Sequence, residues 1–117
     1  MHIDQKLQAE LDQISNRVAH GIVNTPDIHP SEFIDGLNLD TLNMSSDRKC
    51  AIGQLRRSYV LWATELDFTF SHDPCDLGIH VPPSVHDRQV LVYYEYLTRE
   101  WCRKISALRR VRQVLAH

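Results

Sequence analysis

The segment from residue 72 to residue 86 gathers side chains that could hold a metal ion. It contains an imidazole or a thiol at four positions: His72, Cys75, His80 and His86. Two carboxylates, Asp73 and Asp76, lie among them. Zinc binds three or four such groups in tetrahedral geometry. The spacing fits no common zinc module, and seven histidines in 117 residues make a chance cluster of exposed loop residues easy. We therefore expect no bound cofactor and keep zinc at these four residues as the alternative.

Catalytic groupings have less support than this metal pattern. Cys75 with a nearby histidine could form a nucleophile and its base, but no family signature surrounds it. His72 and Asp73, like His86 and Asp87, are adjacent in sequence. Adjacent residues do not face each other on a helix. Gly53 and Gly78 are isolated, so the chain lacks a glycine-rich loop that cradles phosphate. We expect no enzymatic activity.

Cationic side chains gather at the C-terminal end of the chain. Residues 99–117 contain a single acid, Glu100, and six bases: Arg99, Arg103, Lys104, Arg109, Arg110 and Arg112. Such a face could contact the phosphates of a nucleic acid, and Tyr93 and Tyr96 could stack on its bases. The net charge of the chain is −2, whereas a dedicated nucleic-acid binder is usually strongly basic. Nucleic-acid binding is therefore an alternative rather than the favoured function.

The competing interpretation of these cations is a solvated helix face with local ion pairs. Glu95 with Arg99 and Glu100 with Lys104 have the i, i+4 spacing that pairs charges on a helix. Residues 1–47 carry eight acids and two bases. An acidic N-terminal part could lie against the basic C-terminal helix, or the asymmetry could mark a surface for an acidic partner.

Aromatic side chains on the same segment favour a protein-binding surface. Tyr, Trp and Arg are enriched at the energetic centres of protein interfaces. Tyr93 and Tyr96 fall partly off the predicted buried stripe of their helix. We predict a protein-interaction surface made of these two tyrosines and the arginines at five positions: Arg99, Arg103, Arg109, Arg110 and Arg112. A homodimer formed along this helix is one form that the interaction could take.

A long amphipathic helix is predicted over residues 84–115. Apolar residues recur there with a 3.6-residue period and should close the core: Val90, Tyr94, Leu97, Trp101, Ile105, Leu108, Val111 and Leu115. Ser84 with Asp87 resembles a capping box, which would start the helix at Ser84. The cations in the last turns oppose the negative end of the helix dipole.

Two further helices are predicted upstream. Residues 4–20 place apolar side chains at spacings of three and four, with Asp4 as the N-cap and Gly21 as the stop. A second long helix should begin in residues 45–47 and run to about Leu66, with Gly53 in its middle.

The remaining segments are predicted to be short or irregular. Pro30 and Ser31 should start one helical turn that ends at Gly36, while residues 37–44 and 67–70 could be extended. Residues 71–83 form the main loop. The fold class is mainly α, a small bundle of three to four helices in a single domain that spans residues 1–117.

Composition excludes several classes of protein. The chain is 43% hydrophobic and 24% charged, which is ordinary for a globular domain. No apolar run approaches the roughly 20 residues that span a bilayer, and the N-terminus lacks a signal-peptide pattern. Three cysteines, widely spaced and odd in number, do not suit a secreted disulfide scaffold. We expect a cytoplasmic protein with no membrane contact.

Four segments together resemble a family of small uncharacterised proteins from actinobacteria and their phages. Residues 37–47 look like the family's L-D-x-L-D-M segment, and residues 50–55 look like C-x-L-G-Q followed by an apolar residue. Residues 77–79 and 97–105 resemble its later L-G-F turn and L-T-x-x-W-x-x-x-I pattern. This chain departs from the family with Ile79 in place of the aromatic. The resemblance implies no activity, but it implies a phage or prophage origin, in the host cytoplasm, and favours a protein that binds a host or phage protein.

Overall fold

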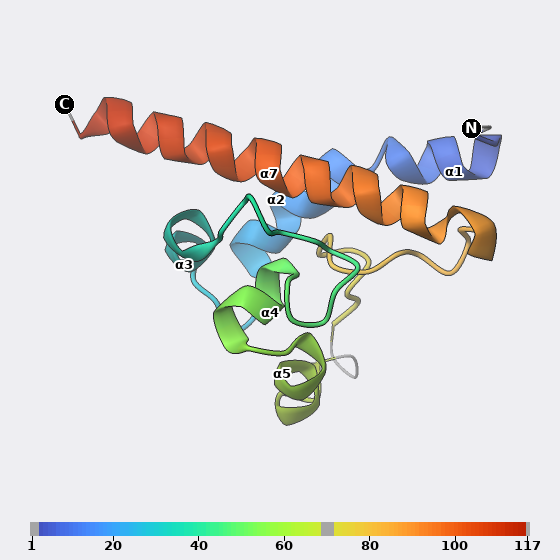
Figure 1. Ribbon diagram of the computed structural model, residues 1–117, viewed down its shortest axis with the longest axis horizontal. Helices are drawn as coiled ribbons and strands as arrows, with labels where there is room; N and C mark the ends of the chain where they lie inside the picture. The colour runs from blue at the N-terminus through green and yellow to red at the C-terminus, as the bar shows by residue number, and fades with distance from the viewer. Residues whose placement is uncertain (1–2, 69–71, 117) are drawn as a thin grey trace.

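The computed structural model describes residues 3–68 and 72–116, and the described part is helical without strands. Its elements are α1 (Gln5–Leu11), α2 (Ile14–Asn24), α3 (Pro30–Gly36), α4 (Ala51–Arg56), α5 (Tyr59–Glu65), the 3-10 turn η1 (Asp87–Gln89) and α7 (Val90–Leu115). Figure 1 shows α7 as a long rod along one side of the molecule, which contacts α1, α2 and α3. The mainly helical class is confirmed.

The long C-terminal helix is also confirmed, although its start is later than predicted. The α-helix begins at Val90, and a 3-10 turn precedes it. His86 rather than Ser84 caps that turn, because its Nδ1 accepts the backbone N–H of Arg88 at 3.1 Å. No helix of the described part is long and apolar enough to cross a membrane.

The N-terminal segment forms two helices, not one. Asp4 caps α1 as predicted, since its Oδ1 accepts the N–H of Leu7 at 2.7 Å. The helix then breaks at residues 12–13, and Gly21 lies inside α2 instead of ending it. A Cβ at Gly21 would overlap the backbone carbonyl of Leu77. The glycine therefore allows close contact with the main loop, and the prediction of a stop at this position is wrong.

The second predicted long helix is likewise split, into α4 and α5. The break falls at Arg57, whose φ of +74° is costly for a residue with a side chain. Ser58 restarts the helix by accepting the N–H of Leu61 at 3.2 Å. The Asp47 carboxylate accepts both the Ser58 hydroxyl and the Val60 N–H at 2.7 Å. These polar contacts hold the chain in the bend that the apolar spacing alone did not predict.

Of the three shorter segments with a predicted conformation, one has the conformation that was predicted. The turn of helix that ends at Gly36 is confirmed as α3. Residues 37–44 form turns rather than an extended segment, and they place Leu37, Leu42 and Met44 in the core. For residues 67–70, Asp67 and Phe68 are not in a strand, and residues 69–70 lie outside the described part.

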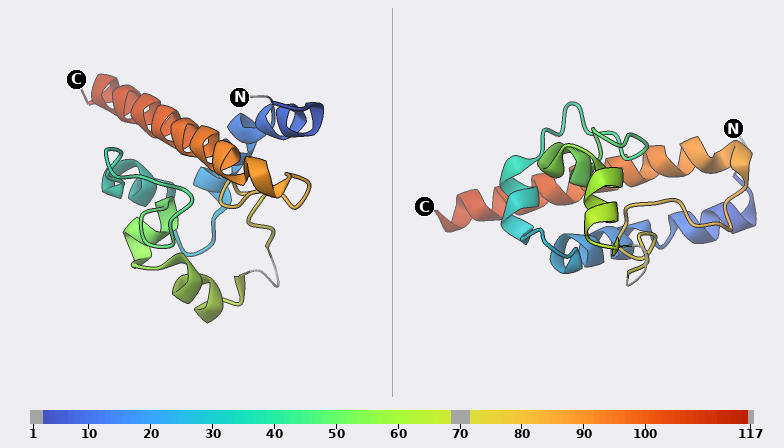
Figure 2. Two further views of the ribbon diagram at one scale, coloured as in Figure 1. Left: turned by 45° about the vertical axis from the view of Figure 1, so that its right-hand side comes forward. Right: turned by 90° about the horizontal axis from the view of Figure 1, so that it is seen from below.

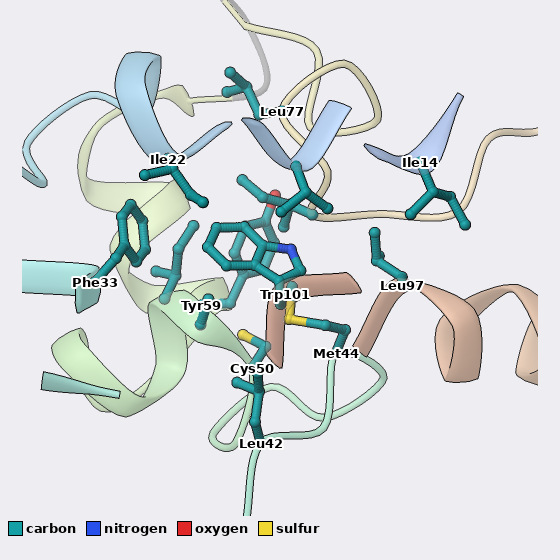
Figure 3. Close-up of a cluster of buried hydrophobic side chains, with 14 of the residues drawn as sticks. Ile14, Ile22, Phe33, Leu42, Met44, Cys50, Tyr59, Leu77, Leu97 and Trp101 are labelled. Carbon is teal, nitrogen blue, oxygen red and sulfur yellow. The ribbon is translucent and has the colours of Figure 1, made fainter. Parts of the chain in front are cut away.

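Trp101 is at the centre of the core. Its side chain is fully buried, and its ring centroid lies 5.1 Å from that of Phe33. Figure 3 shows the sulfur atoms of Met44 and Cys50 near one side of the indole. The indole Nε1 donates to the carbonyl of Gly78 at 2.7 Å, which ties the main loop to α7. The core thus closes around the middle of α7, and its last turns lie outside it.

Candidate interaction site

The last two turns of α7 carry apolar side chains that the described part of the chain leaves partly or largely exposed. Val111, Val114 and Leu115 are 56%, 74% and 81% exposed, and Leu108 is exposed as well. Figure 1 and the right-hand view of Figure 2 show this end of the helix extending past α3. The prediction that Val111 and Leu115 help to close the core is therefore wrong, because the body of the protein ends at α3. We call Leu108, Val111, Val114 and Leu115 the distal strip.

Two arginines fix this end of α7 to α3. Arg109 donates through Nε to the carbonyl of Ile34 and through Nη2 to that of Leu37, each at 2.6 Å. These carbonyls belong to the C-terminal end of α3, where intrahelical partners are lacking. One turn further on, Arg112 forms an ion pair with Asp35. The sequence predicted both arginines as contact residues for a partner, whereas the structure uses them to hold the helix in place.

The distal strip lies on a different side of α7 from these anchors. Leu108, Val111 and Leu115 follow the i, i+3, i+7 spacing of a single helix face. At 100° per residue, Arg109 points about 130° and Arg112 about 70° away from the centre of this face. The anchors therefore hold the helix without covering its apolar side.

Most cations upstream of the strip also have partners on the protein. Arg99 pairs with Glu95 at 2.8 Å, and Lys104 lies 3.5 Å from Glu100, which confirms the two predicted i, i+4 pairs. Arg103 donates to both oxygens of Glu100 at 2.8 and 2.6 Å. Partial burial opposes ionisation of Glu100, but its two cationic neighbours outweigh burial and lower its pKa.

Arg110 differs from the other cations of the segment. It is exposed and has no hydrogen-bond or ion-pair partner among residues 3–68 and 72–116. One interpretation of the charge asymmetry is that the acidic N-terminal part pairs with the basic helix. Such an ion pair is found between Arg112 and Asp35.

The two tyrosines of the predicted surface differ in burial. Tyr93 is fully buried, and its hydroxyl accepts a hydrogen bond from Arg17 at 3.2 Å. Burial raises the pKa of Tyr93. It is therefore a core residue, and its predicted role as an exposed contact is wrong, because α1 and α2 cover a side of α7 that the stripe did not include. Tyr96 is exposed, with the Arg99 guanidinium 5.6 Å from its ring centroid.

The predicted metal ligands are engaged in separate contacts. His72 stacks on Phe68 with ring centroids 5.4 Å apart, and His80 meets Tyr59 edge-on at 4.6 Å. The Cys75 thiol donates to the Val81 carbonyl at 3.4 Å, while His86 caps η1. In the described part of the chain, no three His, Cys, Asp or Glu side chains form a group that could hold a metal ion. Zinc at these four residues therefore stays an untested alternative.

The thiols of Cys75 and Cys50 are not activated as nucleophiles. Burial and the nearby Asp73 raise the pKa of Cys75 to about 11, and burial raises the pKa of Cys50. A thiol with a raised pKa is a poor nucleophile at neutral pH. Cys50 instead caps α4, with its Sγ 3.2 Å from the N–H of Gly53.

A cavity that sequence reasoning did not identify lies between residues 44–50, α5, the main loop and α7. Its volume is about 220 Å³, and Tyr59, His80 and Tyr94 contribute to its lining. The Tyr59 hydroxyl is buried and lacks a hydrogen-bond partner in the described part, and burial raises its pKa to about 12. Only the aromatic types could have indicated this cavity, since its walls come from segments far apart in sequence.

Comparison of the chain with protein-family models, with curated proteins and with solved structures finds no match. The resemblance to small actinobacterial and phage proteins therefore remains a prediction.

Proposed function

We propose that this protein is a protein-binding module that contacts its partner through the distal strip of α7. The observation that carries the proposal is the uncovered apolar face of Leu108, Val111, Val114 and Leu115 at the end of an anchored helix. Single exposed apolar residues are common on protein surfaces, but contiguous apolar patches mark interaction sites. An amphipathic helix that lays its apolar face against a partner is a recurrent mode of recognition.

The anchors support this proposal over a merely frayed helix end. Arg109 and Arg112 hold the last turns in a helical conformation before any partner arrives. A surface that is already ordered loses less conformational entropy on binding than one that must fold. The distal strip is thus presented as a preformed ridge.

Nucleic-acid binding has less support from the same geometry. Five of the six cations of residues 99–117 contact groups of the protein itself: Arg99, Arg103, Lys104, Arg109 and Arg112. Arginines that bind phosphate need donors free to reach it. Apolar side chains dominate the exposed face instead, and they suit a protein surface.

Site-specific photo-crosslinking tests the proposed function. A photoreactive amino acid at position 115 should give a discrete adduct with another protein in a lysate of the source organism. The same amino acid at position 91 is the matched control, because Leu91 is 74% exposed on the same helix but lies at its other end. Val111→Asp should abolish the adduct at 115 without changing the unfolding midpoint. An identical adduct pattern from both positions, or none from 115, would refute the proposal.

A further inference from the structure

We infer that the partner segment is an acidic amphipathic helix, an inference that rests on the proposed function. The distal strip provides the apolar side chains of the contact. The charged side chains around the strip indicate which charge the partner should carry.

The surroundings of the strip are basic. Between Arg103 and Ala116 the helix has five cationic residues and no acidic one. Two carboxylates from outside this segment, Glu100 and Asp35, pair with some of these cations. The cations therefore outnumber the carboxylates that contact them, and Arg110 is left exposed without a partner in the described part.

The cations border the strip on both long edges. Helical spacing places Arg110 beside Val114, on one edge, and Arg112 beside Leu108, on the other edge, each pair at i, i+4. The Arg112–Asp35 pair is exposed, so Arg112 can share its charge with an incoming carboxylate. An apolar ridge with basic borders is complementary to an apolar face with acidic borders.

The shape of the strip fits a helix. Leu108, Val111 and Leu115 lie within about 60° of one another around the helix, and Val114 flanks them on the side of Val111. The four span seven residue steps, which is about 10 Å along the axis. Two to three turns of a partner helix, with apolar residues at i, i+3 or i+4 and i+7, would cover that length. Acidic residues next to this apolar face would then lie opposite the arginines.

A second copy of this chain fits less well. Two distal strips packed together would bring arginines against arginines, and like charges at an interface are unfavourable. Four apolar side chains on each copy also provide less surface than the roughly 800 Å² per partner of a stable interface. The observations favour an acidic partner over self-association.

Three designed peptides test this inference. Each has 16 residues and leucines at i, i+3, i+7 and i+10, and the positions flanking the leucines are all Glu, all Gln or all Lys. Amide chemical shifts of the protein report binding. We expect the Glu peptide to bind about 10-fold more tightly than the Gln peptide at low salt, since several exposed ion pairs of modest strength add together. Salt at about 0.5 M should remove most of that difference.

Two variants of the protein separate the apolar and the charged contributions. Leu115→Asp should abolish binding of all three peptides, whereas Leu91→Asp should leave binding unchanged. Arg110→Glu should reduce the preference for the Glu peptide about threefold or more and leave the Gln peptide little affected.

The outcomes distinguish the inference from the proposed function. Equal binding of the Glu and Gln peptides, or no peptide binding while position 115 still crosslinks to a protein, overturns the inference and leaves the proposed function standing. Sedimentation that shows a dimer dissociated by Leu115→Asp identifies a second copy as the occupant and also overturns it. Binding of single-stranded or duplex DNA that is lost in Arg110→Glu, with no protein adduct at 115, overturns both.

Discussion

Replacing Arg109 with alanine tests whether the end of α7 is held by its bond to α3. The side chain is half-buried and donates two charge-assisted hydrogen bonds, each 2.6 Å long, to the carbonyls of Ile34 and Leu37. Charge-assisted bonds contribute more than neutral ones, but water can reach these carbonyls once the guanidinium is gone. We expect Arg109→Ala to lower the free energy of unfolding by about 2 kcal/mol.

The adjacent residue provides the control. Arg110 has the same side chain, lies on the same turn and has no partner in the described part of the chain. Arg110→Ala should therefore change the free energy of unfolding by less than about 0.5 kcal/mol.

Two measurements check this comparison. In urea denaturation the two variants should differ by about 1.5 kcal/mol or more, and the melting temperature of Arg109→Ala should fall by about 6–10 °C. Amide hydrogen exchange in residues 110–115 should accelerate in Arg109→Ala but not in Arg110→Ala. Equal stability of the two variants would refute the anchoring of α7 to α3, and with it the preformed ridge on which the proposed function depends.

Three further substitutions test the core and its pH dependence. Gly21→Ala should destabilise the protein by about 2 kcal/mol, because the new methyl group meets the backbone carbonyl of Leu77, whereas Gly36→Ala meets only a movable side-chain atom and should be nearly neutral in urea denaturation. Trp101→Phe removes the donor to a buried loop carbonyl and should cost about 2–3 kcal/mol in the same assay; a loss below about 1 kcal/mol would contradict the role of that bond. Burial lowers the pKa of His80 from its ordinary 6.5, so the unfolded chain binds more protons than the folded one as the pH falls. The free energy of unfolding should therefore decrease below about pH 6.5. His80→Phe should flatten this dependence between about pH 7 and 5, and an unchanged dependence would refute the assignment to His80.

The helical class and the middle of α7 could be predicted because they depend on local periodicity. Leu97, Trp101 and Ile105 recur at helical spacing and are fully buried. The same rule failed at Tyr93 and Tyr94. Tyr93 is fully buried and Tyr94 half-buried, the reverse of the prediction, because α1 and α2 pack against one side of the helix while the main loop packs against another. A single row of apolar residues at helical spacing does not indicate on how many sides other elements pack against the helix.

The helix breaks could not be predicted from periodicity either. The apolar spacing continues through Arg57, and Tyr59 and Trp62 remain buried after the break. The bend is held by Asp47, which is eleven residues upstream of Ser58 in sequence. Gly21 shows the same limit, since only the position of Leu77 explains why a side chain is excluded there. These features depend on contacts between distant segments.

The distal strip follows from the same reasoning applied to the end of α7. Burying a valine or leucine side chain is worth about 1.5–3 kcal/mol, yet Val111, Val114 and Leu115 remain largely exposed and contribute little of this to folding. The last turns could be just as helical with lysine, glutamate or glutamine at these positions, since those residues have equal or better helix propensity than valine. Helix formation and core packing therefore leave the apolar character of the strip unexplained. The proposed contact with a partner would account for both that character and the adjacent anchors, because the anchors hold in place a surface that the described part of the chain leaves largely uncovered.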